Sequence, residues 1–206
     1  MDIKCKDQFE NISNIFTKKG YGCRSWKSTI INIDKKQEDI KISSYNTRRE
    51  IKQIKKLKVT VSEINNFDEY KVYIHHFFQT HGHQSYPNKK KYLDIKTWQN
   101  LKLKHNFFIL NIDNIPYAVF CVRIYLDRAY WCMVGRVKEF KHSLHAFSID
   151  YLYKYLKDKN IQMFDLAGFN PYPKDKKEEG IKRFKEKFDG KIIFQPSFIL
   201  DNTTFI

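Results

Sequence analysis

Hydrophobic residues recur with two different periods along this chain. Over residues 143–157 they fall at i, i+3, i+4 and i+7, so that Leu144, Phe147 and Tyr151 share one face while Lys154 lies on the other. This spacing predicts an amphipathic helix. Three short apolar runs precede it, separated by turn residues, and predict an antiparallel three-stranded meander. The runs cover 107–112, 117–126 and 129–134, with turns at 113–114 and 127–128.

Shorter patterns complete the list of predicted elements. Further β-branched and apolar runs predict strands at 28–33, 59–64, 161–166 and 191–195. Helical spacing predicts helices at 67–80, 94–104 and 177–188. The resulting order is β-α-β-α-α-β-β-β-α-β-α-β, which is typical of an α/β domain with a mixed β-sheet flanked by helices.

A basic region after the first strand also has helical features. Asp34 suits a helix N-cap, and Gln37 three residues later completes a capping box. We expect helix from there to about residue 57, interrupted near 43–44, with Ile51 and Ile54 along its apolar stripe. Residues 1–24 are polar and contain two glycines, and they are interpreted as an N-terminal extension.

Composition narrows the class of protein. Of 206 residues, 42% are hydrophobic and 16% aromatic, with 7 Gly and 5 Pro, which excludes a chain that is disordered throughout. The 38 Lys and Arg against 23 Asp and Glu give a formal charge of +15. Such a charge attracts polyanions, including nucleic acid, phosphate-rich cofactors and an anionic membrane surface. The alternative is a lysine-rich composition that only keeps the protein soluble.

The four cysteines, Cys5, Cys23, Cys121 and Cys132, show no C-x-x-C pairing. Two of them lie in strand-like apolar runs, where free cysteine behaves as a small hydrophobe. The pattern therefore predicts no structural disulfides and a reducing, cytoplasmic location. The sequence has neither an apolar leader nor a run of about 18 apolar residues, so we expect no signal peptide and no transmembrane segment.

Two separated motifs carry a family resemblance. Residues 164–168 read F-D-L-A-G, and residues 180–191 read G-I-K-R-F-K-E-K-F-D-G-K. Upstream, residues 25–34 read S-W-K-S-T-I-I-N-I-D, and residues 47–61 read T-R-R-E-I-K-Q-I-K-K-L-K-V-T-V. Together with the element order, these stretches resemble FemAB-like acyltransferases of the GNAT superfamily, over roughly residues 24–195. The resemblance implies a single GNAT-like acyltransferase domain over 25–206.

The same resemblance implies an activity. FemAB-like proteins include aminoacyltransferases that move an amino acid from aminoacyl-tRNA to an amine of a cell-wall precursor. They usually carry two GNAT-like halves, whereas this chain has the length of one. We therefore expect an N-acyltransferase with acyl-CoA or aminoacyl-tRNA as donor co-substrate and no bound cofactor. Its acceptor would be an amine-bearing sugar nucleotide or peptidoglycan precursor, in cell envelope biogenesis. An aminoacyl-tRNA-dependent bridge enzyme is the alternative.

Two residues are the catalytic candidates. Lys185 matches a family lysine at the reaction centre, where an ammonium can stabilise the oxyanion of the tetrahedral intermediate. A solvated lysine on a basic helix is the alternative. Asp165 ends an apolar strand, where burial raises a carboxyl pKa and would make it a base. A carboxylate that caps or fixes a loop is equally compatible with its position.

Further residues are candidates for substrate binding. Arg48 belongs to the R-x-x-I motif and is expected to bind an acceptor phosphate, unless it forms a surface ion pair near Glu50. Gly168, Arg183 and Phe184 are expected to shape the acceptor pocket, although the 184/188 spacing of phenylalanines also suits core packing. Tyr86, in the loop at 81–87, completes this group.

The loop at 135–143 is the candidate donor site. It leads to a helix N-terminus, where backbone N–H groups can hold pyrophosphate. Arg136, Lys138, His142 and Ser143 are its expected donor-binding residues, with solvated surface charge as the alternative. The loop lacks the glycine pattern of CoA-binding GNAT proteins.

Two other functions remain open. Histidines at 75, 76, 81 and 83 suggest a metal, but the spacing does not match a zinc site, and an acceptor-binding loop suits them better. The high charge is also compatible with a non-catalytic basic nucleic-acid-binding module, for which the chain shows no RNP signature or clear helix-turn-helix.

Overall fold

The computed structural model describes residues 21–81, 92–136 and 139–200. The strands in these residues are β1 (Tyr21–Asn32), β2 (Val59–Glu63), β3 (His105–Ile112), β4 (Ile115–Tyr125), β5 (Arg128–Arg136), β6 (Met163–Phe169) and β7 (Lys191–Leu200). The helices are α2 (Tyr45–Lys55), α3 (Phe67–His81), α5 (Ile95–Lys102), α6 (Leu144–Asp158) and α7 (Lys176–Lys185). Along the chain they follow the order predicted from the sequence.

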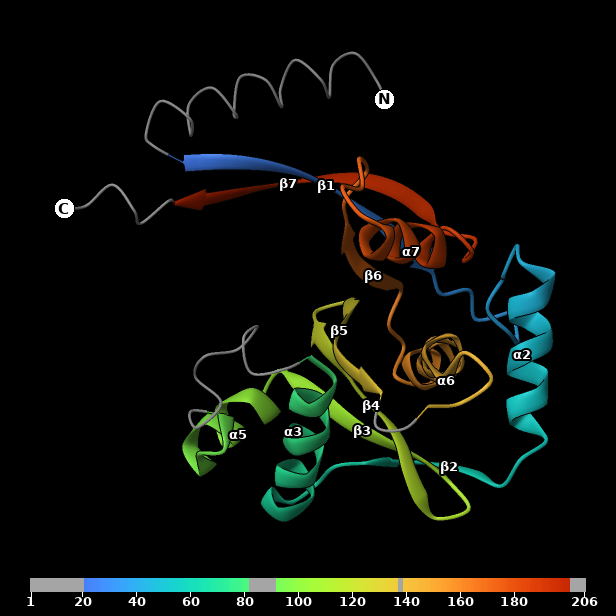
Figure 1. Ribbon diagram of the computed structural model, residues 1–206, viewed down its shortest axis with the longest axis vertical. Coiled ribbons are helices and arrows are strands. Elements are labelled where there is room, and N and C mark those ends of the chain that lie inside the picture. Colours follow the sequence, from blue (N-terminus) through green and yellow to red (C-terminus); the bar gives the residue numbers. More distant parts are fainter. Residues whose placement is uncertain (1–20, 82–91, 137–138, 201–206) are drawn as a thin grey trace.

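The seven described strands form one mixed sheet in the order β2-β3-β4-β5-β6-β1-β7, with helices beside it (Figure 1). All neighbouring strands are antiparallel except β5 and β6, which are parallel. The predicted mixed α/β architecture is thus confirmed. β1 lies between β6 and β7, so the first strand of the chain joins the last two.

The predicted meander is β3-β4-β5. Asp113 and Asn114 connect β3 to β4 with positive φ angles of 51° and 63°, as a tight hairpin turn requires. The second turn lies one residue before its predicted place, because Leu126 adopts the left-handed conformation with φ 55° and β5 begins at Arg128.

Two apolar clusters pack on opposite faces of the sheet. On one face, α2 and α6 bury Ile54, Phe147 and Leu152 against strand residues such as Phe120 and Leu166. On the other, α3 packs its aromatic rings against β3 and β4. Tyr73 and Phe107 meet there edge to face, with ring centroids 5.1 Å apart. The face covered by α2 and α6 is also the one that receives α7, through Phe184.

The helix predicted to begin at Asp34 is wrong in its first half. Residues 33–44 form turns and an isolated bridge between Ile42 and Phe188. Asp34 accepts from the Lys36 amide at 2.8 Å, which closes a turn instead of a helix. Ile40 and Ile42 both enter the core, and a helix from Asp34 would not place Ile42 beside Phe188. The second half of the prediction is confirmed as α2, which Ser44 caps and which buries Ile51 and Ile54.

Other boundaries differ from prediction as well. β6 ends at Phe169 instead of 166, so that Asp165 lies inside the strand and not at its end, and β7 ends at Leu200 instead of 195. β1 begins at Tyr21 instead of residue 28, because its first half pairs with β7 from Tyr21/Leu200 to Ile30/Lys191. α7 ends at Lys185 instead of 188, which frees Phe188 to bridge Ile42. None of the helices in the described residues has the length and apolar character of a bilayer-spanning segment.

Candidate functional site

The parallel strands β5 and β6 separate soon after they meet. Their paired positions run only from Arg128/Met163 to Tyr130/Asp165, although β5 continues to Arg136 and β6 to Phe169. Beyond Asp165, β6 pairs with β1 alone and follows the part of the sheet that carries α7 (Figure 1). The residues after Asp165 therefore lie at an opening in the sheet.

A bulge in β6 sits at this opening. Opposite β1, Ser28 pairs with Gly168 but Ile30 with Asp165, so β6 has one extra residue. Ala167 takes it up in the left-handed conformation, with φ 62°. The Asp165 carboxylate holds the bulge, because its Oδ1 accepts from the Ala167 amide at 2.8 Å and from the Ser28 hydroxyl.

Lys185, at the end of α7, is joined to the same bulge. Its Nζ donates to the carbonyl oxygens of Ala167 (3.1 Å) and Gly168 (2.8 Å). The residue is only 7% exposed. Burial lowers the pKa of Lys185 to about 8, and the negative charge of Asp165 acts in the opposite direction. The solvated lysine considered as the alternative for this position is thus excluded.

A pocket of about 400 Å³ opens beside this lysine. Gly168, Phe169 and Asn170 from the end of β6 form one side, and Ile181 and Lys185 from α7 form the other. Asp175, the N-cap of α7, also lines the pocket together with Lys177 and Glu178, so the lining carries side chains of both charges. The Asn170 amide donates to Glu178 at 2.8 Å and fixes that carboxylate.

An aromatic cluster connects β5, α6 and α7 next to the opening. The Phe184 ring lies 6.0 Å from Trp131 and 5.4 Å from Phe188, between ring centroids. His145 meets both Trp131 and Phe184 edge to face. Phe184 therefore makes core contacts, as the alternative for this residue predicted. The indole N–H of Trp131 is buried and has no hydrogen-bond partner among the described residues.

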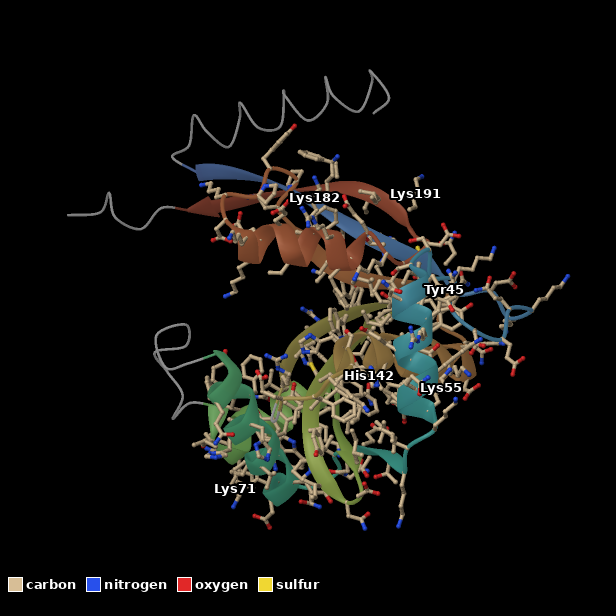
Figure 2. The ribbon with its side chains drawn as sticks, turned by 45° about the vertical axis from the view of Figure 1, so that its right-hand side comes forward. Tyr45, Lys55, Lys71, His142, Lys182 and Lys191 are labelled. Carbon is tan, nitrogen blue, oxygen red and sulfur yellow. The ribbon has the colours of Figure 1, made fainter. Side chains whose placement is uncertain are left out.

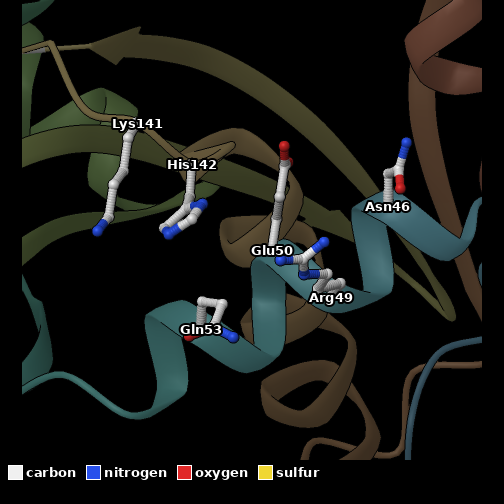
Figure 3. A pocket seen from close by; sticks show the side chains of 6 residues that line it. All are labelled: Asn46, Arg49, Glu50, Gln53, Lys141 and His142. Atoms are coloured by element: carbon white, nitrogen blue, oxygen red, sulfur yellow. The ribbon is translucent and has the colours of Figure 1, made fainter.

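The predicted donor loop borders a different pocket, of about 460 Å³. Asn46, Arg49, Glu50 and Gln53 of α2 form one wall, and Lys141 and His142 the other (Figure 3). Figure 2 shows His142 beside α2, between Tyr45 and Lys55. The amide of Ser143 donates to the Glu50 carboxylate at 3.3 Å, while the Ser143 hydroxyl caps α6. A carboxylate of the protein thus occupies the start of α6.

The other predicted residues have different surroundings. The Arg48 guanidinium donates to the backbone carbonyls of Ile42 and Ser43, the latter at 3.0 Å, and so fixes the segment before α2. Arg183 pairs with Glu179 on the exposed side of α7. Arg136 pairs with Glu139 at 3.4 Å. Tyr86 and Lys138 lie outside the described residues.

Sequence reasoning missed three residues at these sites. Ser28 belongs to the quoted W-K-S-T-I-I stretch, but its bond to Asp165 spans 137 residues and appears only once β1 is placed beside β6. Arg49 and Glu50 are next to the chosen Arg48, and the helical turn rather than the motif decides which of them faces the loop. The pockets therefore combine predicted residues, Gly168, Lys185 and His142, with neighbours that the motifs did not indicate.

Comparison with known structures shows the fold. No protein-family model and no curated protein matches the chain. L-PGS from Bacillus licheniformis is similar over 93% of this chain and 66% of its own, with TM-score 0.61 and 10% identity. FemX is similar over 83% of this chain and 59% of its own, with TM-score 0.61 and 10% identity.

A GCN5-related N-acetyltransferase from Kribbella flavida is similar over 90% of this chain and 62% of its own, with TM-score 0.53 and 10% identity. This chain therefore spans less than two thirds of the length of these three proteins. The protein has a GNAT-like, FemAB-related fold, as the motifs predicted.

Proposed function

We propose that this protein is an N-acyltransferase. It moves an acyl or aminoacyl group from acyl-CoA or aminoacyl-tRNA to an amine of a cell-envelope or saccharide precursor. The observation that carries the proposal is the Lys185 ammonium, which is buried, bound to the bulge of β6 and lines a pocket between the end of β6 and α7.

Lys185 is the residue to which we assign catalysis. Among the described residues, the carbonyls of Ala167 and Gly168 are the hydrogen-bond acceptors of its Nζ, which leaves the third N–H for a substrate oxygen. When the acceptor amine attacks the acyl carbonyl, negative charge develops on that oxygen. A fixed ammonium in a site shielded from water stabilises this charge more than solvent does.

The reaction balances without a further reactant. The amine nitrogen forms the amide bond, the thioester or ester bond of the donor breaks, and the amine proton passes to the leaving thiol or hydroxyl group. Asp175 and Glu178, which line the pocket together with Lys177, attract an amine acceptor, which releases its extra proton to solvent and attacks as the neutral amine.

We assign Asp165 a positioning role. Its bonds to Ser28 and Ala167 hold the bulge, and the bulge presents the two carbonyls that orient Lys185. This corresponds to the loop-fixing alternative for this residue rather than to a general base. The side chains of Arg49, Lys141 and His142 are the proposed contacts for the phosphates of the donor, since Glu50 of the same pocket already binds the amide at the start of α6.

The test is transfer from labelled donors. Acetyl-CoA and a mixture of aminoacyl-tRNAs are offered separately, with amino-sugar nucleotides and an amine-bearing peptidoglycan precursor as acceptors, and amide products are identified by mass spectrometry. We expect a product with one donor class. Lys185→Met should lower kcat by about 10²–10³-fold.

Lys176→Met is the matched control, because Lys176 lies on the exposed side of the same helix. It should retain the rate of the unchanged protein. Full turnover by Lys185→Met would overturn the role of Lys185. Absence of transfer from both donors, together with salt-sensitive RNA binding, would replace the proposal with the nucleic-acid-binding module.

A further inference from the structure

Two cysteines face each other on the side of the sheet that α3 covers, away from the transferase site. Cys121 of β4 and Cys132 of β5 are directly opposite in the strand register. Their sulfur atoms are 3.1 Å apart, and both thiols are free. Cys121 is buried and Cys132 is half-buried. Cys132 is therefore the more exposed member of the pair.

The backbone already has the geometry of a disulfide. Directly opposite residues of antiparallel strands have Cα atoms about 4.5–5.5 Å apart, and disulfides join Cα atoms about 4.4–6.8 Å apart. The strand register therefore places the two Cα atoms within the range that a disulfide joins. The sequence separates the two cysteines by a hairpin, so the short loop closes without threading another segment.

The neighbouring side chains make the two thiols unequal. The Nδ1–H of His105 donates to the Leu101 carbonyl at 3.0 Å, and the His105 ring acts electrostatically on Cys132. The hydrogen bond from Cys121 and then the interaction with His105 lower the pKa of Cys132 to about 6. The hydroxyl of Tyr73 hydrogen-bonds Cys121, whose pKa burial raises well above its usual value.

This combination is that of a reactive thiol with a resolving partner. Reactive cysteines are partly exposed and lie beside a cationic or hydrogen-bonding group. Buried thiols are inert unless an oxidised cysteine lies next to them, with which they can form a disulfide. Cys132 meets the first description and Cys121 the second. The contacts come from β3, β4 and α3, so the fold places each of them.

We propose that Cys132 is a peroxide-reactive thiol and that Cys121 resolves its oxidised form, closing a disulfide between β4 and β5. In the first step the Cys132 thiolate attacks a hydroperoxide, the O–O bond breaks, and one oxygen stays on sulfur as a sulfenic acid. The other oxygen leaves as water or an alcohol. In the second step Cys121 attacks that sulfur, the S–S bond forms, and the S–O oxygen leaves as water.

Two electrons pass from the two thiols to the peroxide, which is reduced. A dithiol reductant reverses the bond by exchange. In a reducing compartment the pair stays as thiols until an oxidant arrives, which is the usual behaviour of disulfides formed there. The inference does not depend on the acyl donor or on transferase activity.

The experiment uses the full chain with Cys5→Ser and Cys23→Ser, so that only the pair remains. After hydrogen peroxide and quenching, we expect a loss of two hydrogens in the intact mass. Trypsin cuts after Arg123 and Arg128, between the cysteines, so the bond should join two peptides. The proposal would be overturned if the two thiols were oxidised by hydrogen peroxide no faster than the thiol of free glutathione. It would also be overturned if the only disulfides formed joined two separate chains.

Three variants separate the two roles. Cys121→Ser should leave a sulfenic acid on Cys132 that dimedone traps, and Cys132→Ser should leave Cys121 unoxidised. His105→Gln should slow oxidation at pH 7 several-fold, while His75→Gln on the exposed side of α3 should not. Alkylation of Cys132 by iodoacetamide should reach half its maximal rate near pH 6, against about 8.5 for an ordinary cysteine. A midpoint near 8.5 would contradict the assignment.

Discussion

The buried ammonium of Lys185 makes the stability of the fold depend on pH in an unusual direction. Its pKa is about 8 in the folded protein and 10.5 when the side chain is exposed. Between these values the unfolded chain holds a proton that the folded protein has released. The free energy of unfolding therefore rises as pH increases through this window, by at most about 3 kcal/mol from this group.

Urea unfolding at pH 7.5 and pH 10 tests this dependence. The difference in unfolding free energy between the unchanged protein and Lys185→Met should increase with pH, because methionine does not titrate. For Lys176→Met, on the exposed side of α7, the same difference should be constant. A constant difference for Lys185→Met would mean that the lysine is not desolvated.

Transferase activity should have the opposite pH dependence. If the ammonium stabilises the oxyanion, kcat should fall as pH rises through about 8, where the folded protein is becoming more stable. Lys185→Arg keeps a positive charge at high pH and should lose this alkaline decline, at a lower maximal rate. A decline that persists in the arginine variant would assign it to another group.

Ser28 is the residue whose loss should weaken the bulge. Ser28→Ala leaves the buried Asp165 carboxylate without the hydroxyl that donates to it, and we expect a destabilisation of about 1–3 kcal/mol in urea unfolding. Ser62→Ala, at an exposed position of β2, is the control and should change stability by less than about 0.5 kcal/mol. Equal effects of the two substitutions would show that the hydrogen bond between Ser28 and Asp165 does not stabilise the fold.

At the scale of elements, two glycines near the site should respond oppositely to alanine. Gly180 lies in the middle of α7 and a Cβ there would meet nothing within 4 Å, so Gly180→Ala should stabilise by about 1 kcal/mol. At Gly190, between α7 and β7, a Cβ would lie 2.7 Å from the Ile30 carbonyl oxygen. Gly190→Ala should therefore destabilise, and thermal unfolding of both variants checks the pair.

Periodicity predicted every described element but not the segment at 33–44. Capping chemistry at Asp34 is a local signal, whereas Ile40 and Ile42 pack in the core and Ile42 bridges Phe188, 146 positions later in the chain. Tertiary contact overrode the local preference. The facing of Cys121 and Cys132 was not predictable because it depends on the position of the turn between β4 and β5. That turn lies one residue before its predicted place, and from Tyr125/Arg128 the register runs without a shift to Cys121/Cys132.

The candidate site was predictable where motifs carried it and not where packing decides. The two motifs pointed to Lys185 and Asp165, and the structure brings them together at one bulge. They did not reveal that Lys185 is buried, since its helix is otherwise basic and exposed. The burial of Lys185 depends on the pairing of β1 with β6, and this pairing is set by the strand order of the sheet.

For the whole molecule, the charge of +15 predicts a salt-dependent interaction with a polyanionic donor. Binding of tRNA should weaken roughly tenfold or more between 50 and 200 mM salt, as phosphate contacts release counterions. Fluorescence anisotropy with labelled tRNA measures this, and a neutral dextran serves as the control ligand. Affinity that is independent of salt would show that the charge is not used for binding.

The place of β1 in the sheet has a consequence for biosynthesis. Its hydrogen-bonding partners are β6 and β7 alone, and β6 is not complete until residue 169 has been made. At roughly 5–20 residues per second, the ribosome takes on the order of ten seconds to travel from the end of β1 to the end of β6. The β2–β5 meander can form during that interval, while β1 waits beside it without a sheet. During translation, β1 therefore has no hydrogen-bonding strand beside it until β6 and β7, the last strands of the sheet, have been synthesised.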